Sequence, residues 1–162
     1  MITALSSLRS PVPLLLATAG LVFTLTLATA ADAGECPAGQ TGIDVTQSSD
    51  ADYEGLTDTV IASIDLGQHI GVDGRLLRLR RLEIAPGGVV AWHSHDNRPG
   101  VVYVLKGSIT EYRSTCRVPI EHKAGDVAPE EKATSHWWRN NTKEPVVLLA
   151  TDVPLDPNDK HM

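Results

Sequence analysis

The chain has no surplus of basic residues and no block of like charges. Lysine and arginine number 14 against 20 aspartates and glutamates, which gives a formal net charge of −6 at pH 7. Nucleic-acid-binding domains present a basic face that neutralises phosphates. The acidic balance therefore argues against a nucleic-acid partner, and the lack of a charge block argues against a charged interaction tail.

Cysteine is scarce, with Cys36 and Cys116 the only two in 162 residues. They lie 80 positions apart, so they do not form the closely spaced pairs of a zinc or iron–sulfur site. In an oxidising compartment they would pair and tie the N-terminal part of the chain to the rest. We expect this disulfide, with two free thiols as the alternative.

Several catalytic signatures are missing. The sequence contains no nucleophile elbow, no glycine-rich phosphate loop and no paired carboxylates suited to acid–base chemistry. It also contains no convincing helical periodicity, internal repeat or low-complexity tract. These absences disfavour the hydrolase and nucleotide-binding classes that depend on such motifs.

Only one long hydrophobic run is present, at residues 12–31. Arg9 precedes it and small residues follow, which is the arrangement of a secretory signal peptide cleaved after Ala30 or Ala33. About 18 to 20 apolar residues also span a bilayer, so an N-terminal membrane anchor is the alternative. We expect residues 1–33 to be a signal peptide, and the mature protein to be periplasmic or secreted with no membrane span.

The rest of the chain consists of short segments typical of β-strands. Residues 34–56 are rich in glycine, serine, aspartate and threonine, and we expect them to form an irregular arm. Strand-like segments alternate with turns over residues 57–153, and residues 154–162 are expected to be a flexible tail. The pattern predicts an all-β fold, a small antiparallel β-barrel. The expected strands are residues 59–66, 77–84, 89–93, 101–105, 108–113, 136–140 and 146–151.

Turn residues divide these strands. Pro86-Gly87-Gly88, Lys106-Gly107 and residues 123–126 are each expected to form a turn. In the segment before the first of these turns, leucines alternate with charged residues, and the doubled Arg80-Arg81 interrupts the alternation. A β-bulge at Arg80-Arg81 would keep the leucines on one face.

Three histidines carry the clearest chemical signal. His93 and His95 are two positions apart, so on a strand both imidazoles point to one face and can hold one metal ion. His136 follows 41 residues after His95, on another expected strand. A third imidazole from a neighbouring strand would complete a facial set and leave coordination positions open.

The spacing around these histidines resembles the two sequence motifs of the cupin superfamily. The first motif is a glycine, five residues, His-x-His, a glutamate three or four residues on, and a glycine seven residues later. Gly87, His93, His95 and Gly107 match this motif, whereas Gly100 stands in the glutamate position.

The second motif is a glycine, five residues, Pro-x-Gly, two residues, a histidine, three residues and an asparagine. Gly125, His136 and Asn140 match it, whereas Glu131 and Ala133 replace the proline and glycine. The two motifs cover roughly residues 75–152, and the chain resembles small single-domain bacterial cupins of the type-2 conserved barrel with a signal peptide.

The resemblance implies a double-stranded β-helix, or jelly-roll-like, barrel with one divalent metal ion on His93, His95 and His136. Iron, zinc, manganese and nickel all suit imidazole ligands. It also implies a metal-dependent dioxygenase or isomerase acting on a small molecule. The alternative is a non-catalytic barrel that binds a small ligand or a partner. Because cupins often pair through sheet edges, a homodimer is implied as well.

The glycine at position 100 alters the expected electrostatics of the site. With no carboxylate to offset it, a divalent cation would attract an anionic ligand more strongly. Asp96, Glu111 or Glu130 could substitute for the missing glutamate from a neighbouring position, but we expect none of them to be a ligand.

Strand alternation also predicts the surroundings of the metal. If His93 and His95 face inward, a mostly apolar pocket should be lined by Ala91, Gly100, Val102, Val104, Thr134 and Trp138. Asn140 is expected to brace a turn. Arg98 is expected to lie at the surface beside the site, with pairing to a substrate carboxylate as the alternative. The histidines outside the motifs are expected to be solvated; they are His69, His122 and His161.

Overall fold

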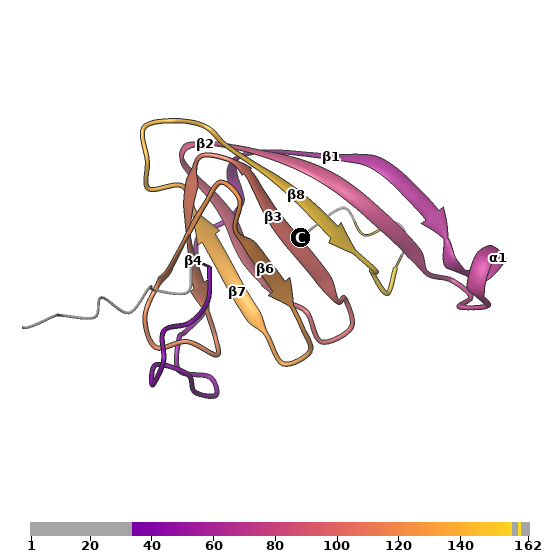
Figure 1. Ribbon diagram of the computed structural model, residues 1–162, viewed down its shortest axis with the longest axis horizontal. Helices are drawn as coiled ribbons and strands as arrows, with labels where there is room; N and C mark the ends of the chain where they lie inside the picture. Colours follow the sequence, from indigo (N-terminus) through magenta and orange to yellow (C-terminus); the bar gives the residue numbers. More distant parts are fainter. Residues whose placement is uncertain (1–33, 157–158, 160–162) are drawn as a thin grey trace, which may run out of the picture.

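A computed structural model describes residues 34–156 and residue 159 (Figure 1). The expected signal peptide at residues 1–33 lies outside the described residues, and so does His161. Among the residues described, no helix is both long and apolar enough to cross a membrane.

The described part of the chain is an antiparallel β-barrel that is nearly closed, which confirms the all-β prediction. The strands are β1 (Glu54–Asp65), β2 (Leu76–Ser94), β3 (Gly100–Lys106), β4 (Ser108–Arg113), β5 (Ile120–Lys123), β6 (Val127–Glu130), β7 (Ser135–Arg139) and β8 (Val146–Asp152). They pair in the order β5-β4-β7-β2-β8-β3-β6, with β1 added beside β2.

The one helix in the described residues is α1 (Leu66–Ile70), a single turn between β1 and β2. Asp65 caps its N-terminus, where the carboxylate accepts hydrogen bonds from the Gly67 and Gln68 amides, and Gly71 caps its C-terminus in the left-handed conformation. β1 and β2 extend past the rest of the barrel toward α1 as a two-stranded ribbon (Figure 1). β1 starts at Glu54, so it includes the last residues of the expected irregular arm.

β2 is one continuous strand, and the turn predicted at Pro86-Gly87-Gly88 is wrong. The chain does not reverse here: residues before the bend pair with β8, and residues after it pair with β7. Gly87 has a φ of 78°, which glycine adopts without the penalty that a Cβ would bring. The three residues therefore redirect one strand from one side of the barrel to the other.

Asn140 holds this bend in place, as expected for a residue that braces a turn. Its side-chain amide donates hydrogen bonds to the carbonyls of Ile84 (3.0 Å) and Ala85 (3.1 Å). Its backbone carbonyl accepts from the Gly87 amide (2.9 Å), and its backbone amide donates to the Gly88 carbonyl (3.0 Å). The side chain is fully buried, so these bonds form away from water.

The bulge predicted at Arg80-Arg81 is also wrong. β2 pairs with β8 without interruption from Arg78 to Ile84, and Arg78 and Arg80 point into the barrel. The register shift in this region lies on β1 instead, between Val60 and Ala62. The arginines tolerate burial because aspartate side chains pair with them, which apolar alternation alone does not reveal.

The apolar core fills the interior of the barrel. In the antiparallel pairs, inward residues stand in rows across neighbouring strands. The row nearest one end is polar, and it consists of Glu130, Gly100, Asp152 and Arg78. Beyond that row the barrel is filled by Leu82, Ile84, Val90, Val102, Val104, Ile109, Ala128, Trp138, Val146, Leu148 and Ala150.

The N-terminal arm is attached to the barrel by covalent and backbone contacts. Cys36 and Cys116 form a disulfide bond, and Thr41 makes an isolated β-bridge with Cys116. The Gly42 amide donates to the Thr115 carbonyl at 3.0 Å. Closing a loop of this length contributes roughly 4 kcal/mol to stability by chain entropy.

Candidate metal centre

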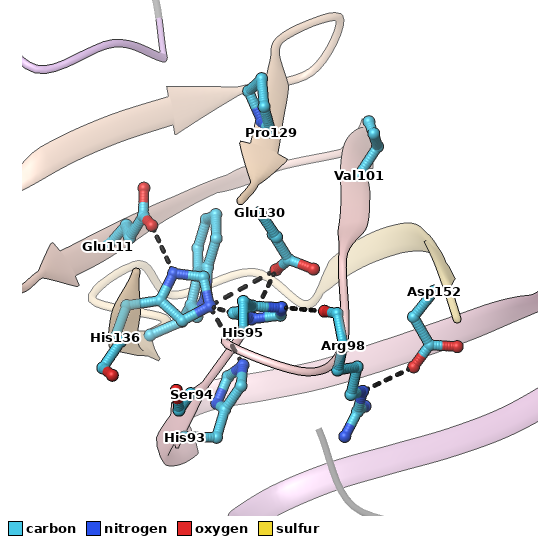
Figure 2. Close-up of polar contacts among 12 residues, drawn as sticks. His93, Ser94, His95, Arg98, Val101, Glu111, Pro129, Glu130, His136 and Asp152 are labelled. Carbon is cyan, nitrogen blue, oxygen red and sulfur yellow. Dashed lines mark hydrogen bonds and ion pairs between the residues drawn. The ribbon is translucent and has the colours of Figure 1, made fainter. Parts of the chain in front are cut away.

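The three motif histidines come together at one end of the barrel. His93 is near the end of β2 and stands opposite His136 of β7, while His95 follows the last residue of β2. The Nε2 atom of His136 lies 2.9 Å from that of His95 and 3.0 Å from that of His93. Figure 2 shows the three rings pointing their Nε2 atoms toward one another. The sequence motifs therefore identified three side chains that do converge.

A carboxylate joins the histidines, and it comes from Glu130 at the end of β6. Its Oε1 atom lies 3.4 Å from Nε2 of His136 and 3.6 Å from Nε2 of His95. The side chain is buried, and Oε1 has no hydrogen-bond donor among the described residues. One atom from each of the four residues lies within 4.8 Å of the others, as expected of a group that can hold a metal ion.

Glu130 occupies the space left by the glycine at position 100. Gly100 on β3 is paired with Glu130 on β6, so both face the barrel interior. A Cβ added to Gly100 would lie 2.6 Å from Oε2 of Glu130. The expectation that no carboxylate reaches the histidines is therefore wrong: the acid lies on the neighbouring strand, directly across from the motif position.

The other two acidic candidates are not near the Nε2 atoms. Oδ1 of Asp96 accepts a hydrogen bond from the Ala133 amide at 2.9 Å. Glu111 contacts the opposite side of the His136 ring, where its Oε1 accepts from Nδ1 at 2.5 Å. Of the three acids considered, only Glu130 lies beside the converging nitrogens.

Each histidine is oriented by an acceptor at its Nδ1 atom. Nδ1 of His93 donates to the Ala91 carbonyl at 2.8 Å, and Nδ1 of His95 donates to the Arg98 carbonyl at 2.8 Å. Nδ1 of His136 donates to Glu111, as described above. With Nδ1 carrying the proton, Nε2 presents its lone pair to the centre, which is the arrangement of metal-binding histidines.

The pKa shifts follow from burial and from the two glutamates. Burial lowers the pKa of His93 and of His95, and the charge of His136 lowers the pKa of His93 further. Burial also opposes charge on His136, but Glu111 and Glu130 outweigh it and raise the pKa of His136 to about 9. Because a metal ligand must be a neutral imidazole, a cation at the centre and a proton would compete for Nε2 of His136.

Glu111 belongs to a buried network behind His136. Burial alone would raise its pKa, but hydrogen bonds from His122 and His136 outweigh burial and lower it. Nε2 of His122 donates to Oε2 of Glu111 at 2.8 Å, and Nε of Arg113 donates to Oε1 at 2.8 Å. Glu111 therefore remains a carboxylate that fixes the ring of His136.

His122 is fully buried, so the expectation that it is solvated is wrong. It lies on β5 and points inward, where the bond to Glu111 offsets the loss of water and its ring packs against Trp138 with centroids 4.8 Å apart. His69 on α1 is exposed, as expected.

A cavity of about 380 Å³ opens beside His93. It lies among the residues that follow β2 and those that follow β8, and it is lined by His93, Ser94, Asp96, Asn97, Arg98, Leu155 and Asp159. Arg98, expected at the surface, is buried here.

None of the six residues expected to line the pocket borders this cavity. Val102, Val104 and Trp138 do face inward, but they pack against one another because side chains fill a small barrel. Ala91 orients His93, and Gly100 makes room for Glu130. Thr134 borders a different cavity, of about 390 Å³, next to Cys36.

A model of the cupin domain matches residues 80–152, from Arg80 on β2 to the end of β8. The matched segment includes the three histidines and Glu130 within one antiparallel barrel. Residues 80–152 thus form a cupin domain, as the motif spacing predicts.

Among known proteins, the chain is similar to germin-like protein subfamily 2 member 1 of Arabidopsis thaliana. The two are 29% identical over an alignment of 103 residues, and the alignment covers 59% of this chain and 47% of the plant protein. The chain thus spans about half the length of this curated relative.

Solved structures share the fold at low identity. The protein TT1209 from Thermus thermophilus superposes with a TM-score of 0.51 and 19% identity, covering 64% of this chain and 90% of that protein. KdgF from Halomonas sp. gives a TM-score of 0.48 and 16% identity, covering 63% of this chain and 86% of that protein. At 19% identity, the likeness to TT1209 concerns the fold alone.

Proposed function

We propose that the barrel binds one divalent transition-metal ion through His93, His95, His136 and Glu130. The observation that carries the proposal is Oε1 of Glu130, a buried carboxylate oxygen next to the Nε2 atoms of His95 and His136 with no hydrogen-bond donor among the described residues. Burying a polar atom without a partner is costly, and a cation at this point would remove the cost.

The spacing of the nitrogens supports the proposal. Two imidazoles bound at about 2.1 Å and at right angles to each other place their nitrogens about 3.0 Å apart. The Nε2 atom of His136 lies 2.9 Å from that of His95 and 3.0 Å from that of His93. Three nitrogens and one carboxylate oxygen suit iron, zinc, manganese or nickel. The carboxylate offsets one unit of the metal's charge.

We further propose that the metal serves a small-molecule oxidoreductase or isomerase. A bound cation in such a site would act as a Lewis acid on an oxygen atom of the substrate. The chain's own contribution is to fix the three imidazoles through their Nδ1 atoms and to fill the barrel with apolar side chains. Oxygen uptake or substrate loss across a panel of acids, diketones and thiols separates this activity from ligand binding alone.

Metal analysis of purified protein, prepared without a histidine tag, tests the metal centre. We expect about one transition-metal ion per chain by elemental analysis, and loss of that metal in His136→Ala, because one of four ligands is removed. His69→Ala is the matched control. His69 is exposed on α1, so this variant should keep its full metal content. Protein that contains no metal after growth with iron, zinc and manganese would contradict the proposal.

An oxidising compartment is the proposed location. The Cys36–Cys116 disulfide supports it, because structural disulfides rarely persist in a reducing cytosol. We expect protein expressed from the full sequence to be exported and to begin at residue 31 or 34. N-terminal sequencing of protein from each cell fraction tests this. Protein found in the cytosol with its first 30 residues still attached would contradict the proposal.

A further inference from the structure

Three arginines are buried at the polar end of the barrel, next to the metal centre. Arg78 and Arg80 project inward from β2, and Arg98 lies in the loop after His95. All three contact Asp152 of β8. Arg78 binds it through Nε (2.9 Å) and Nη2 (2.7 Å), Arg98 through Nε (2.8 Å), and Arg80 through Nη1 (3.3 Å). Figure 2 shows Arg98 between His95 and Asp152.

The strands supply two carboxylates for these three guanidinium groups. Asp152 is shared as described, and Asp58 of β1 pairs with Arg80 through Nε at 3.0 Å. A third carboxylate comes from the segment that follows β8: Oδ2 of Asp159 lies 3.3 Å from Nη1 of Arg98. Without Asp159, the cluster would hold one positive charge more than its strand carboxylates neutralise.

Arg98 also borders the cavity beside the metal centre. Its side chain is only 10% exposed, and it lines the cavity together with His93 and Asp159. Its Nε atom is bound to Asp152, so the Nη1 side of the guanidinium is the part that meets Asp159. Asp96, the other acid on the cavity wall, accepts a hydrogen bond from Ala133.

We propose that this cavity binds a small carboxylate, which pairs with Arg98 in the place now taken by the Asp159 side chain. The planar guanidinium edge matches a carboxylate, and one negative charge balances the cluster once Asp159 moves away. A volume of about 380 Å³ accommodates a small organic acid. The Asp159 side chain then acts as a competitor that a substrate must displace.

The other end of such a ligand would face His93. Because His93 belongs both to the cavity wall and to the histidine cluster, a short acid held at Arg98 places its remaining atoms toward the metal centre. This part of the inference rests on the proposed metal centre. The pairing with Arg98 does not, because it depends on charge and shape alone.

Pyruvate and its neutral amide, pyruvamide, test the inference by titration calorimetry on the full chain, both as purified and after zinc loading. We expect saturable pyruvate binding at one site and no detectable pyruvamide binding. Arg98→Gln should weaken pyruvate binding by roughly tenfold or more. Arg139→Gln is the matched control, since Arg139 is exposed on β7, and it should leave the affinity unchanged.

Asp159→Asn is a variant for which we expect a gain of pyruvate affinity, which a misfolded protein would not show. Removing the competing charge should raise pyruvate affinity by roughly threefold to tenfold, and this gain should vanish in the Arg98→Gln background. If Asp159 only anchors its own segment, Asp159→Asn leaves the affinity unchanged, and the inference is overturned. Equal binding of pyruvate and pyruvamide also overturns it.

Metal content measured on the same samples separates the two proposals. Protein that takes up no metal even after zinc loading, yet shows the Arg98 and Asp159 effects, contradicts the metal centre and supports the carboxylate site. Protein with full metal content whose pyruvate affinity is unchanged by both substitutions contradicts the carboxylate site and leaves the metal centre standing.

Discussion

Asp152 is the residue on which the buried charges of the barrel depend. Three guanidinium groups contact its carboxylate, and the side chain is 4% exposed. Burial alone would raise the pKa of Asp152, but the hydrogen bond from Arg78 and the charge of Arg98 outweigh burial and lower it. Asp152 is therefore ionised in the folded protein at neutral pH.

The lowered pKa of Asp152 determines how the free energy of unfolding changes with pH. Because the pKa is lower in the folded than in the unfolded chain, ionised Asp152 stabilises the fold above about pH 4, and this contribution is lost as the pH falls further. We expect Asp152→Asn to lower the free energy of unfolding at pH 7 by about 3 kcal/mol, since the arginines lose their shared partner.

Urea unfolding at a series of pH values measures both effects. The difference between the native protein and Asp152→Asn should be largest near neutral pH and should shrink below pH 4, as the stabilisation from ionised Asp152 is lost in the native protein too. A difference that stays constant from pH 7 to pH 3 would show that the charge of Asp152 is not what stabilises the cluster.

At the scale of elements, the turn between β6 and β7 carries a residue in an unfavourable conformation. Ala133 has a φ of 68°, in the left-handed region where a Cβ is strained. It stands where the cupin motif has glycine, and the turn places Glu130 and His136 on either side of the metal centre. The turn thus keeps the backbone conformation that glycine would adopt in the motif, and the Cβ of Ala133 makes this conformation less stable.

Replacing Ala133 with glycine should remove part of this cost. Glycine adopts the left-handed conformation freely but loses more entropy on folding, so we expect a net gain of about 0.5 to 1 kcal/mol in unfolding free energy. Thermal denaturation of metal-free protein checks this, with Ala124→Gly, in the turn before β6, for comparison. A lower melting temperature for Ala133→Gly than for the native protein would contradict the claim that Ala133 is strained.

The pairing of β3 with β6 explains why position 100 holds glycine. A side chain there would meet Oε2 of Glu130 at 2.6 Å and the carbonyl oxygen of Thr151 at 2.7 Å. The second contact involves backbone, which cannot swing aside as a side chain can. A glutamate at position 100 therefore competes with Glu130 for space and does not simply restore a missing ligand.

For the whole molecule, the strand pattern and the two motifs predict the barrel and the three histidines from sequence. Alternation places Val102, Val104 and Trp138 inside correctly, because period-two patterning follows from strand geometry. The turns at Gly107 and Gly125 also fall between strands, and both glycines have positive φ. Local rules suffice for these features.

The remaining features depend on which strands lie side by side. Arg78 and Arg80 face inward because Asp152 and Asp58 meet them from other strands. Glu130 joins the histidines because β6 pairs with β3 at Gly100. Glu130 shares strand parity with the buried Ala128, which marks it as inward. Strand parity alone does not show that Glu130 lies opposite Gly100, which has no side chain to occupy the space.

The central claim is that Glu130 supplies the carboxylate of a four-residue metal centre in the barrel. The most direct test is the dissociation constant of zinc, measured by competition with a chromophoric chelator, for the native protein, Glu130→Gln and Glu131→Gln. Glutamine keeps the shape of the side chain and removes its charge. Glu131 is exposed and adjacent in sequence, which makes it the matched control.

We expect Glu130→Gln to weaken zinc binding by about 10- to 100-fold or more, since an anionic ligand is lost, and Glu131→Gln to bind zinc as the native protein does. The metal-free variants should unfold at similar temperatures, which excludes misfolding as the cause. Unchanged zinc affinity in folded Glu130→Gln would contradict the account, because the carboxylate beside the three histidines would then take no part in holding the metal.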